Sequence, residues 1–395
     1  MVCLGVSIKS LNLTMLKSRN TRCLRVLIFN HSYPVQFIDV SNQYARAFGD
    51  EVEVCVVYLT GKPDEEIRQK TLAQEVIFLD CPSSVVRGLK LSVIRKMIQL
   101  QRQKSFDVVI CHRYKPTYVM LWVAKFCRIP LLISVMHELG AFRHFSRKLL
   151  LALLASKELI LAGVSNAVRD DLRRSVWRLP PGRILTLYNM IDMEYTEPRL
   201  FSREEARAKL SVPAEAFVFG NVGRLAKNKD QKTLIAAFSL IKAFCPHAKL
   251  IILGEGQLES ELKQQVNQLN LNQDIIFTGF VVEGFRYMKA FDAYVSSSIQ
   301  EAFGRVLLEA MIAYIPVIAT RVNGMPEVLG DTGFIVDPEQ PKALAEAMLS
   351  IYQGSLEQRS HWVEKAYKRV REVFSIPKFQ EVMGQILLPG LDSNQ

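Results

Sequence analysis

Sequence signatures of a metal site, a disulfide framework and a dinucleotide site are all missing from this chain of 395 residues. It contains no Asp-x-Asp and no Cys-x-x-Cys, and its cysteines and histidines do not cluster at the spacing of metal ligands. Gly254 and Gly256 form only a fragment of the G-x-G-x-x-G fingerprint, because the last glycine is absent. We therefore expect no bound metal ion, and the incomplete fingerprint weighs against a nicotinamide cofactor.

Long hydrophobic runs are missing too. The longest apolar stretch, residues 118–136, contains Lys125, Arg128 and Pro130, so it divides into a helix and a strand and is not a membrane span. Residues 1–24 carry four cations that interrupt any secretory signal, and we expect an N-terminal extension there, with Met15 as a candidate start. The seven cysteines are odd in number and several lie in apolar runs, which is typical of reduced, buried thiols in a cytoplasmic protein.

Acidic residues are scarce in the N-terminal half. Residues 1–195 hold 28 Lys and Arg against 16 Asp and Glu, a net charge of +12, whereas residues 196–395 hold 22 against 23, a net charge of −1. The first half therefore carries the whole excess of +11. This imbalance predicts an acidic partner for that half: anionic lipid, a phosphorylated glycan or nucleic acid.

Short apolar runs alternate with amphipathic segments from Arg25 onward, a pattern that predicts mostly parallel sheets covered by helices. The runs span 25–30, 51–58, 76–80, 107–111, 130–136, 160–165 and 183–188, and then 218–223, 248–254, 275–280, 293–298, 316–321 and 332–337. We predict the α/β class, with two doubly wound, Rossmann-like domains that face each other across a cleft. The expected boundaries are 25–190 and 191–375 for the domains, and 376–395 for a C-terminal helix that can cross back to the first domain.

The stretch EAFGRVLLE, residues 301–309, follows one of these predicted strands, and Gly304 opens a helix within it. Free N–H groups and the dipole at the start of a helix favour an anion. Glu301 lies in the loop and Glu309 on the helix, where their carboxylates can accept hydrogen bonds from hydroxyls. The combination fits a nucleotide sugar better than a bare phosphate; ordinary surface glutamates on an amphipathic helix are the alternative.

A second candidate lies after the predicted strand that ends at Gly223. Arg224 and Lys229 follow this glycine, and a planar guanidinium together with a compact ammonium suits a diphosphate. A basic loop without a ligand is the alternative.

In the first half, His31, His112 and His137 each follow a predicted strand directly, although the chain has only six histidines. Ligands bind at the strand carboxyl ends of open α/β sheets, so these are candidates, with loop or capping histidines as the alternative. Residues 87–104 mix six cations with seven large aliphatic residues at near-helical spacing. This segment could lie on an anionic membrane, or it could be a solvated helix that packs its apolar side inward.

Taken together, six motifs resemble the retaining glycosyltransferases of family 4, which have the GT-B fold. They occur in the family's order and at similar spacings: GRLAKNKD (223–230), LIILGEGQLESEL (250–262), IIFTGFV (275–281), EAFGRVLLEAMIAYIPVIAT (301–320), NGMPEVL (323–329) and TGFIVDP (332–338). The chain departs from the family in the loop 30–37, which lacks paired glycines, at Met190 in place of a hinge glycine, and at Asn323 where a glycine is common.

The resemblance implies a role for each candidate residue. Arg224 and Lys229, after Gly223, would hold the donor diphosphate, Glu301 and His137 would contact the donor sugar, and Glu309 would bind the ribose. The turn at Gly279 and Phe280 would lie against the nucleobase, and the backbone near Phe303 and Gly304 would approach the sugar and the phosphate.

The resemblance also implies a function: transfer of a sugar from a UDP- or GDP-linked donor, without a metal ion, to an anionic glycan or lipid-linked acceptor, with retention of anomeric configuration. A growing lipopolysaccharide core or another cell-surface polysaccharide would suit the basic N-terminal domain, and we expect a cytoplasmic enzyme peripheral at the inner face of the membrane, with no nucleic-acid partner. Two alternatives are an epimerase of the same fold and a non-catalytic sensor of nucleotide sugars whose basic half binds membrane or nucleic acid.

Overall fold

The computed structural model describes residues 23–33, 35–82 and 90–392. The predicted extension thus lies almost wholly outside the described residues, as do the first three residues of the basic segment 87–104. Packing divides the chain into two compact units. Unit 1 comprises the residues up to Met190 together with the segment from Ile376 onward, and unit 2 is Ile191–Ser375.

Unit 1 is built on a parallel sheet of seven strands in the order β3-β2-β1-β4-β5-β6-β7. The strands are β1 (Arg25–Asn30), β2 (Glu53–Tyr58), β3 (Glu75–Phe78), β4 (Val108–His112), β5 (Leu131–Met136), β6 (Leu159–Gly163) and β7 (Ile184–Thr186). The helices are α2 (Val35–Phe48), α3 (Glu65–Lys70), α5 (Leu91–Lys104), α6 (Tyr114–Val123), α7 (Phe145–Leu154), α8 (Asn166–Ser175) and α17 (Ile376–Asp392). Every residue of β4, β5 and β6 is buried, as expected for a parallel sheet covered on both faces.

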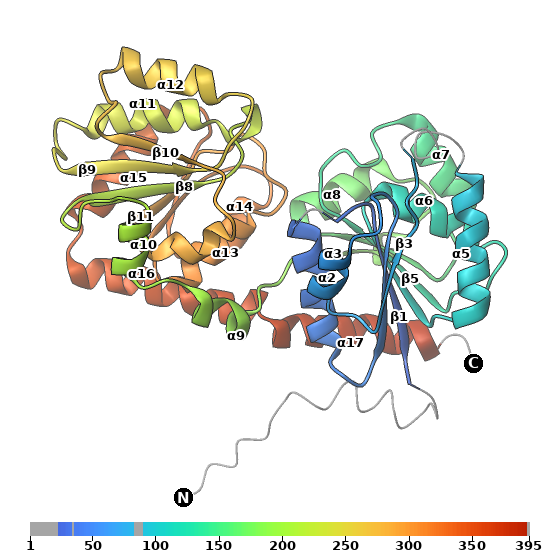
Figure 1. The fold of residues 1–395 in the computed structure, drawn as a ribbon. Coiled ribbons are helices and arrows are strands. Elements are labelled where there is room, and N and C mark those ends of the chain that lie inside the picture. The colour runs from blue at the N-terminus through green and yellow to red at the C-terminus, as the bar shows by residue number, and fades with distance from the viewer. Residues whose placement is uncertain (1–22, 34, 83–89, 393–395) are drawn as a thin grey trace, which may run out of the picture. The chain divides into compact units, whose positions relative to one another are not determined.

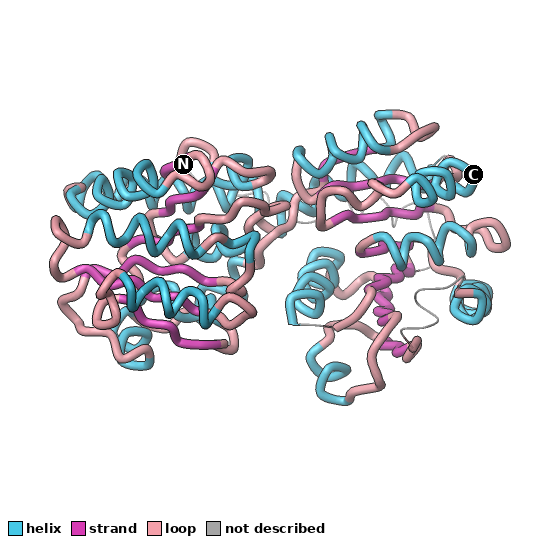
Figure 2. Tube along the Cα trace, turned by 90° about the horizontal axis from the view of Figure 1, so that it is seen from above, coloured by secondary structure: helices cyan, strands magenta, loops and turns pink. Residues whose placement is uncertain are grey.

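Unit 2 repeats this architecture with six parallel strands in the order β10-β9-β8-β11-β12-β13. The strands are β8 (Phe217–Val222), β9 (Ala248–Leu253), β10 (Ile275–Gly279), β11 (Ala293–Ser296), β12 (Val317–Thr320) and β13 (Phe334–Val336). The helices are α9 (Met193–Thr196), α10 (Arg203–Lys209), α11 (Gln231–Ile241), α12 (Glu259–Gln268), α13 (Arg305–Ile312), α14 (Met325–Leu329), α15 (Pro341–Gln353) and α16 (Leu356–Arg369). Figure 2 shows the strands of each unit between layers of helices.

The predicted α/β fold class with two Rossmann-like domains is confirmed. The strand order of each sheet reverses once, between β1 and β4 in unit 1 and between β8 and β11 in unit 2. At such a switch point the loops that follow the two strands diverge, and the space outside the carboxyl ends is the usual ligand site of an open α/β sheet. The sheets therefore single out the loops after these four strands.

The end of the chain packs on unit 1. After α16 a π-helical segment, Val370–Phe374, leads to Ser375, and α17 starts at the next residue, Ile376. In α17, Phe379 meets Tyr44 of α2 edge-on at 4.9 Å, and the Gln380 amide donates to the Ala47 carbonyl at 2.8 Å. Figure 1 shows α17 alongside α2.

One buried ion pair joins three parts of unit 2. The Asp292 carboxylate precedes β11 and accepts from the Arg207 guanidinium and from the Val218 amide, both at 2.7 Å. Arg207, on α10, is buried and also donates to the carbonyls of Ala290, Pro213 and Ala214. This pair fastens α10 to the edge of the sheet where β8 and β11 begin.

Candidate functional site

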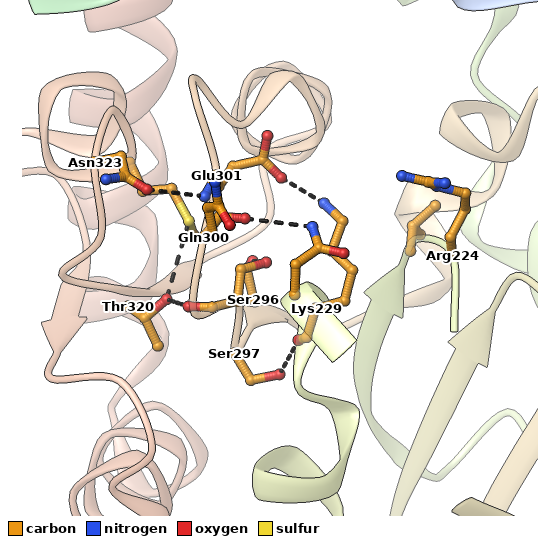
Figure 3. Close-up of polar contacts among 12 residues, drawn as sticks. Arg224, Lys229, Ser296, Ser297, Gln300, Glu301, Thr320 and Asn323 are labelled. Carbon is orange, nitrogen blue, oxygen red and sulfur yellow. Dashed lines mark hydrogen bonds and ion pairs between the residues drawn. The ribbon is translucent and has the colours of Figure 1, made fainter. Parts of the chain in front are cut away.

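The loops after β8 and β11 are joined by a pair of opposite charges. The Lys229 ammonium lies 2.5 Å from the Glu301 carboxylate, and both side chains are about one-fifth exposed, at 21% and 22% (Figure 3). The Ser297 hydroxyl donates to the Lys229 carbonyl at 3.0 Å, and the Ile299 amide donates to the Asn228 carbonyl at 2.9 Å. These bonds hold the two loops of the switch point in one arrangement.

A third loop, after β12, positions Glu301. The Asn323 side-chain oxygen accepts from the Glu301 amide at 3.2 Å, and the Gly324 amide donates to the Glu301 carbonyl at the same distance (Figure 3). A Cβ atom at Gly324 would lie 2.2 Å from the Ala302 carbonyl oxygen, so only glycine allows this approach. Sequence reasoning had noted Asn323 only as a replacement of a glycine and missed its contact with Glu301.

Arg224 is exposed directly after β8. In the described part of the chain its guanidinium has no ion-pair or hydrogen-bond partner, and Figure 3 shows it apart from the Lys229–Glu301 pair. The glycines of the incomplete fingerprint support this loop: a Cβ atom at Gly254 would lie 2.0 Å from the Gly223 carbonyl oxygen, and one at Gly256 would lie 2.3 Å from that of Leu225. These two glycines therefore serve close packing of two loops.

Glu301 and Glu309, the two acids of the EAFGRVLLE stretch, both affect the pKa of one buried side chain. Tyr294 of β11 is buried, and its hydroxyl donates to the Val222 carbonyl at 3.4 Å. Burial raises the pKa of Tyr294 well above its usual range, and the negative charges of Glu309 and Glu301 raise it further. Both carboxylates thus lie near Tyr294, on the edge of the sheet where Lys229 lies.

The start of α13 and the end of β10 complete this edge. Gly304, with φ +92°, precedes α13 and gives it no side-chain cap, and the positive end of the helix dipole lies at this edge. Gly279, with φ +70°, accepts from the Gly254 amide at 2.9 Å, and the next residue, Phe280, is 64% exposed. Phe303, in contrast, is buried against Phe374, so only its backbone can reach a ligand.

Three histidines mark the carboxyl edge of β1, β4 and β5 in unit 1, where the sequence had placed them. His112 is fully buried, and its Nδ1 lies 2.9 Å from Nε2 of His137. Burial, together with the charge of Arg113, lowers the pKa of His112 to about 3. Burial likewise lowers the pKa of His31 to about 4, with contributions from Lys115 and Arg113.

Arg113, which sequence reasoning had not singled out, lies near two of these histidines, since its charge affects the pKa values of His31 and His112. It directly follows β4 in the sparsely populated region of positive φ, at +74°, and such strain is often found at functional sites. Its guanidinium lies 4.5 Å from the centre of the Phe37 ring, and Phe37 in turn meets His137 edge-on at 5.8 Å. Its position after a strand is the only signal that the sequence offers for it, and a solvated cation shares that signal.

The lowered pKa values predict a pH-dependent stability of unit 1. Unfolding returns His31 and His112 toward pKa 6.5, so the unfolded chain binds more protons from about pH 6.5 down to about pH 4, and stability falls as pH falls through this window. Each histidine contributes at most about 1.4 kcal/mol per pH unit. In urea unfolding at several pH values, His112→Asn should flatten this dependence, whereas His361→Asn in unit 2 should leave it unchanged. Equal slopes for His112→Asn and the unchanged protein would contradict the prediction.

No group of three or more Asp, Glu, His or Cys side chains among the described residues is placed to hold a metal ion. None of the helices that the structure describes is both long and apolar enough to cross a membrane.

Family comparisons assign both units. Residues 36–195 match the family model described as Glycosyltransferase Family 4, and residues 202–369 match the model described as Glycosyl transferases group 1. Among curated proteins, the chain is 27% identical over 334 residues to an enzyme of Campylobacter jejuni, N-acetylgalactosamine-N,N'-diacetylbacillosaminyl-diphospho-undecaprenol 4-alpha-N-acetylgalactosaminyltransferase. That match covers 80% of this chain and 85% of the relative.

Solved structures agree in fold. A glycosyltransferase from Rickettsia africae superposes with a TM-score of 0.80 at 18% identity, covering 95% of this chain and all of that one. HepE from Anabaena, in complex with UDP, gives a TM-score of 0.75 at 22% identity and covers 93% of this chain and all of that one. The prediction of a nucleotide-sugar-dependent hexosyltransferase is confirmed by the family models and the curated relatives. The chain therefore belongs to the GT-B glycosyltransferases of the family 4 type.

Proposed function

We propose that unit 2 binds a UDP- or GDP-linked sugar and that unit 1 binds an anionic glycan or lipid-linked acceptor, to which the sugar passes with retention of anomeric configuration. The observation that carries the donor half is the Lys229–Glu301 pair at the switch point of unit 2, with the exposed Arg224 in the same loop after β8 as Lys229. The UDP bound to HepE supports a nucleotide donor of this kind.

The edge of unit 2 offers a separate place for each part of such a donor. The exposed Phe280 after β10 gives the nucleobase an apolar surface, and Arg224 and Lys229 after β8 face the diphosphate. Glu301 after β11 accepts from sugar hydroxyls, and Glu309 on α13 accepts from the ribose. Since β10, β9, β8 and β11 are consecutive in the sheet, this order runs along a single edge.

The proposed reaction places charge where this edge can stabilise it. The bond between the anomeric carbon and the diphosphate oxygen breaks, and its electron pair leaves with the diphosphate. Arg224, Lys229 and the positive end of the α13 dipole stabilise that negative charge, so the route needs no metal ion. The acceptor hydroxyl forms the new bond on the face that the diphosphate leaves, and its proton passes to a leaving phosphate oxygen. An inverted anomeric centre in the product, measured by NMR, would overturn this front-side route.

The basic edge of unit 1 supports an anionic acceptor. Arg113 and Lys115 lie near His31 at its switch point, where their charges help to lower the pKa of His31. These two cations would attract a phosphate group on the acceptor. The Campylobacter relative acts on a sugar linked to diphospho-undecaprenol, which supports a lipid-linked acceptor; the core of lipopolysaccharide and other cell-surface polysaccharides are members of the same class. We place the enzyme at the inner face of the cytoplasmic membrane, without a nucleic-acid partner.

Thermal unfolding with a panel of nucleotide sugars tests the donor half. A donor at about 100 times its Kd stabilises the folded state by about 2.7 kcal/mol, which raises Tm of a unit of this size by about 5–10 °C. One nucleotide family should produce this shift, and Glu309→Ala should abolish it. Glu346→Ala, which removes an exposed acid from α15, is the matched control and should retain it. No shift with any UDP- or GDP-linked sugar would overturn the donor assignment.

A further inference from the structure

Helix α7 and the segment after α8 expose a continuous group of large apolar side chains, which we call the α7 surface. Phe145, Leu149 and Leu153 recur every four residues along α7 and are 64%, 43% and 63% exposed, whereas Leu151 and Leu154 on the other side are buried. Trp177 is 43% exposed and meets Phe145 at 5.4 Å between ring centres. Isolated exposed leucines are ordinary, but four large apolar side chains on one face are typical of an interaction surface.

The segments that carry these side chains are basic throughout. Residues 139–157 contain four Lys or Arg and no acid, and residues 172–183 contain another four and no acid. The Lys148 ammonium lies 5.7 Å from the centre of the Trp177 ring, so positive charge borders the apolar stripe directly. Glu138 and Glu158 flank the first segment, and Asp170 and Asp171 precede the second, where their carboxylates accept from the Arg169 guanidinium and from the Gly140 amide. The surface therefore matches a partner that is apolar and negatively charged.

The predicted membrane segment, α5, lacks such a face. Its apolar residues Val93, Ile94 and Met97 are buried, and Leu91 is its one large apolar side chain in the described residues that is mainly exposed. The exposed remainder of α5 is polar and basic, so the inward-packing alternative is correct for this helix. The apolar contact with a membrane has to come from elsewhere in unit 1.

The α7 surface adjoins the edge of unit 1 that we assign to the acceptor. The Arg147 guanidinium lies 4.5 Å from the centre of the Tyr114 ring, and Tyr114 is the first residue of α6, next to Arg113. Phe142, just before α7, meets the same ring at 5.5 Å. A lipid bound under α7 could thus present its head group to Arg113 without leaving the bilayer.

We propose that the α7 surface docks unit 1 onto an anionic lipid bilayer, with Phe145, Leu149, Leu153 and Trp177 at the boundary between head groups and acyl chains. This inference rests on the proposed lipid-linked acceptor and adds the surface by which the enzyme reaches it. Aromatic rings prefer this boundary, burial of the leucines removes apolar surface from water, and the nearby cations are attracted to an anionic surface.

Co-sedimentation of the full chain with vesicles tests the surface. The unchanged protein should bind vesicles of phosphatidylcholine with phosphatidylglycerol, bind pure phosphatidylcholine less, and lose binding as salt is raised. Leu149→Glu with Leu153→Glu should lower the partition constant at least about tenfold. The matched control, Leu240→Glu with Phe244→Glu, replaces two exposed apolar residues of unit 2 and should bind as the unchanged protein does. Equal binding of the α7 variant and the control would overturn the proposal.

A second measurement does not depend on charged substitutions. Anionic vesicles should shift the tryptophan emission of the full chain to shorter wavelength, and Trp177→Phe should remove the shift. The proposal would be overturned if the emission shift persists in Trp177→Phe. It would also be overturned if the protein binds no lipid but forms concentration-dependent dimers that the α7 variant abolishes. The donor-induced rise in Tm does not involve this surface. If the rise occurs but vesicles are not bound, only the docking proposal is rejected. If the rise does not occur, the donor assignment is rejected.

Discussion

Replacing Lys229 with Ala is expected to lower kcat/KM for sugar transfer about 10³-fold. Removal of one well-placed donor from a site where negative charge develops costs about 10²–10³ in rate. Here the loss should lie at the upper end of this range, because Lys229 also neutralises Glu301 at 2.5 Å, and without it that carboxylate faces the leaving diphosphate with its charge unpaired. Initial rates with the donor identified by thermal unfolding measure the effect.

The same chain provides the control. Lys227 lies in the same 3₁₀ turn and is exposed, so Lys227→Ala should change kcat/KM by no more than about twofold. Lys229→Arg keeps the charge and should recover part of the activity. Because the cation stabilises charge that appears as the bond breaks, most of the loss should fall on kcat and less on KM. Similar losses for Lys227→Ala and Lys229→Ala would show that the basic loop acts only through its overall charge.

Replacing Asp292 with Ala is expected to lower the free energy of unfolding of unit 2 by about 3–5 kcal/mol. The substitution leaves the Arg207 guanidinium, 4% exposed, without its counter-ion, and it leaves the Val218 amide without the carboxylate that accepts from it. Breaking a buried pair by removal of one partner has a cost of this size, because the remaining charge stays desolvated. Urea unfolding followed by circular dichroism measures it.

Asp337 provides the matched comparison for Asp292. It pairs with Arg321 at 3.1 Å, but both side chains are more than half exposed, so Asp337→Ala should cost less than about 1 kcal/mol. Asp292 holds α10 at one end of the strands, whereas the donor edge lies at the opposite end. The fraction of the Asp292→Ala protein that remains folded should therefore still bind the donor. A cost below about 1 kcal/mol for Asp292→Ala would mean that water compensates Arg207.

Much of this fold could be predicted because parallel strands that are buried on both faces leave a strong apolar signal. All thirteen predicted runs overlap a strand of the structure, although β7, Ile184–Thr186, is half the length of its predicted run. Strand ends are less predictable. The predicted run 293–298 includes Ser297 and Ser298, which are buried, but β11 has ended before them and they bond to other segments of the chain. The apolar pattern in the sequence reveals which residues are buried, and burial extends beyond the residues whose backbones form the hydrogen bonds of the sheet.

The candidate site was predictable in part for a related reason. Lys229 and Glu301 follow strands, and the carboxyl ends of parallel strands share one edge, so the approach of these two residues across 72 residues of sequence could be expected. The contacts that hold them could not: the Asn323 side chain on the Glu301 amide depends on how a third loop folds back. Arg113 was missed because one cation after a strand does not differ in sequence from a solvated one.

The sequence by itself determined three properties: the fold class, the basic first half and nearly neutral second half of the chain, and the residues available at each sheet edge. All three follow from local periodicity and composition. The tertiary structure alone decided which of those residues meet. It also decided which of two similar amphipathic helices buries its apolar side chains. α5 and α7 both combine cations with aliphatic residues, yet α5 buries its apolar side and α7 leaves Phe145, Leu149 and Leu153 exposed. The neutral state of His112 likewise depends on complete burial beside Arg113, which arises only when distant segments pack around it.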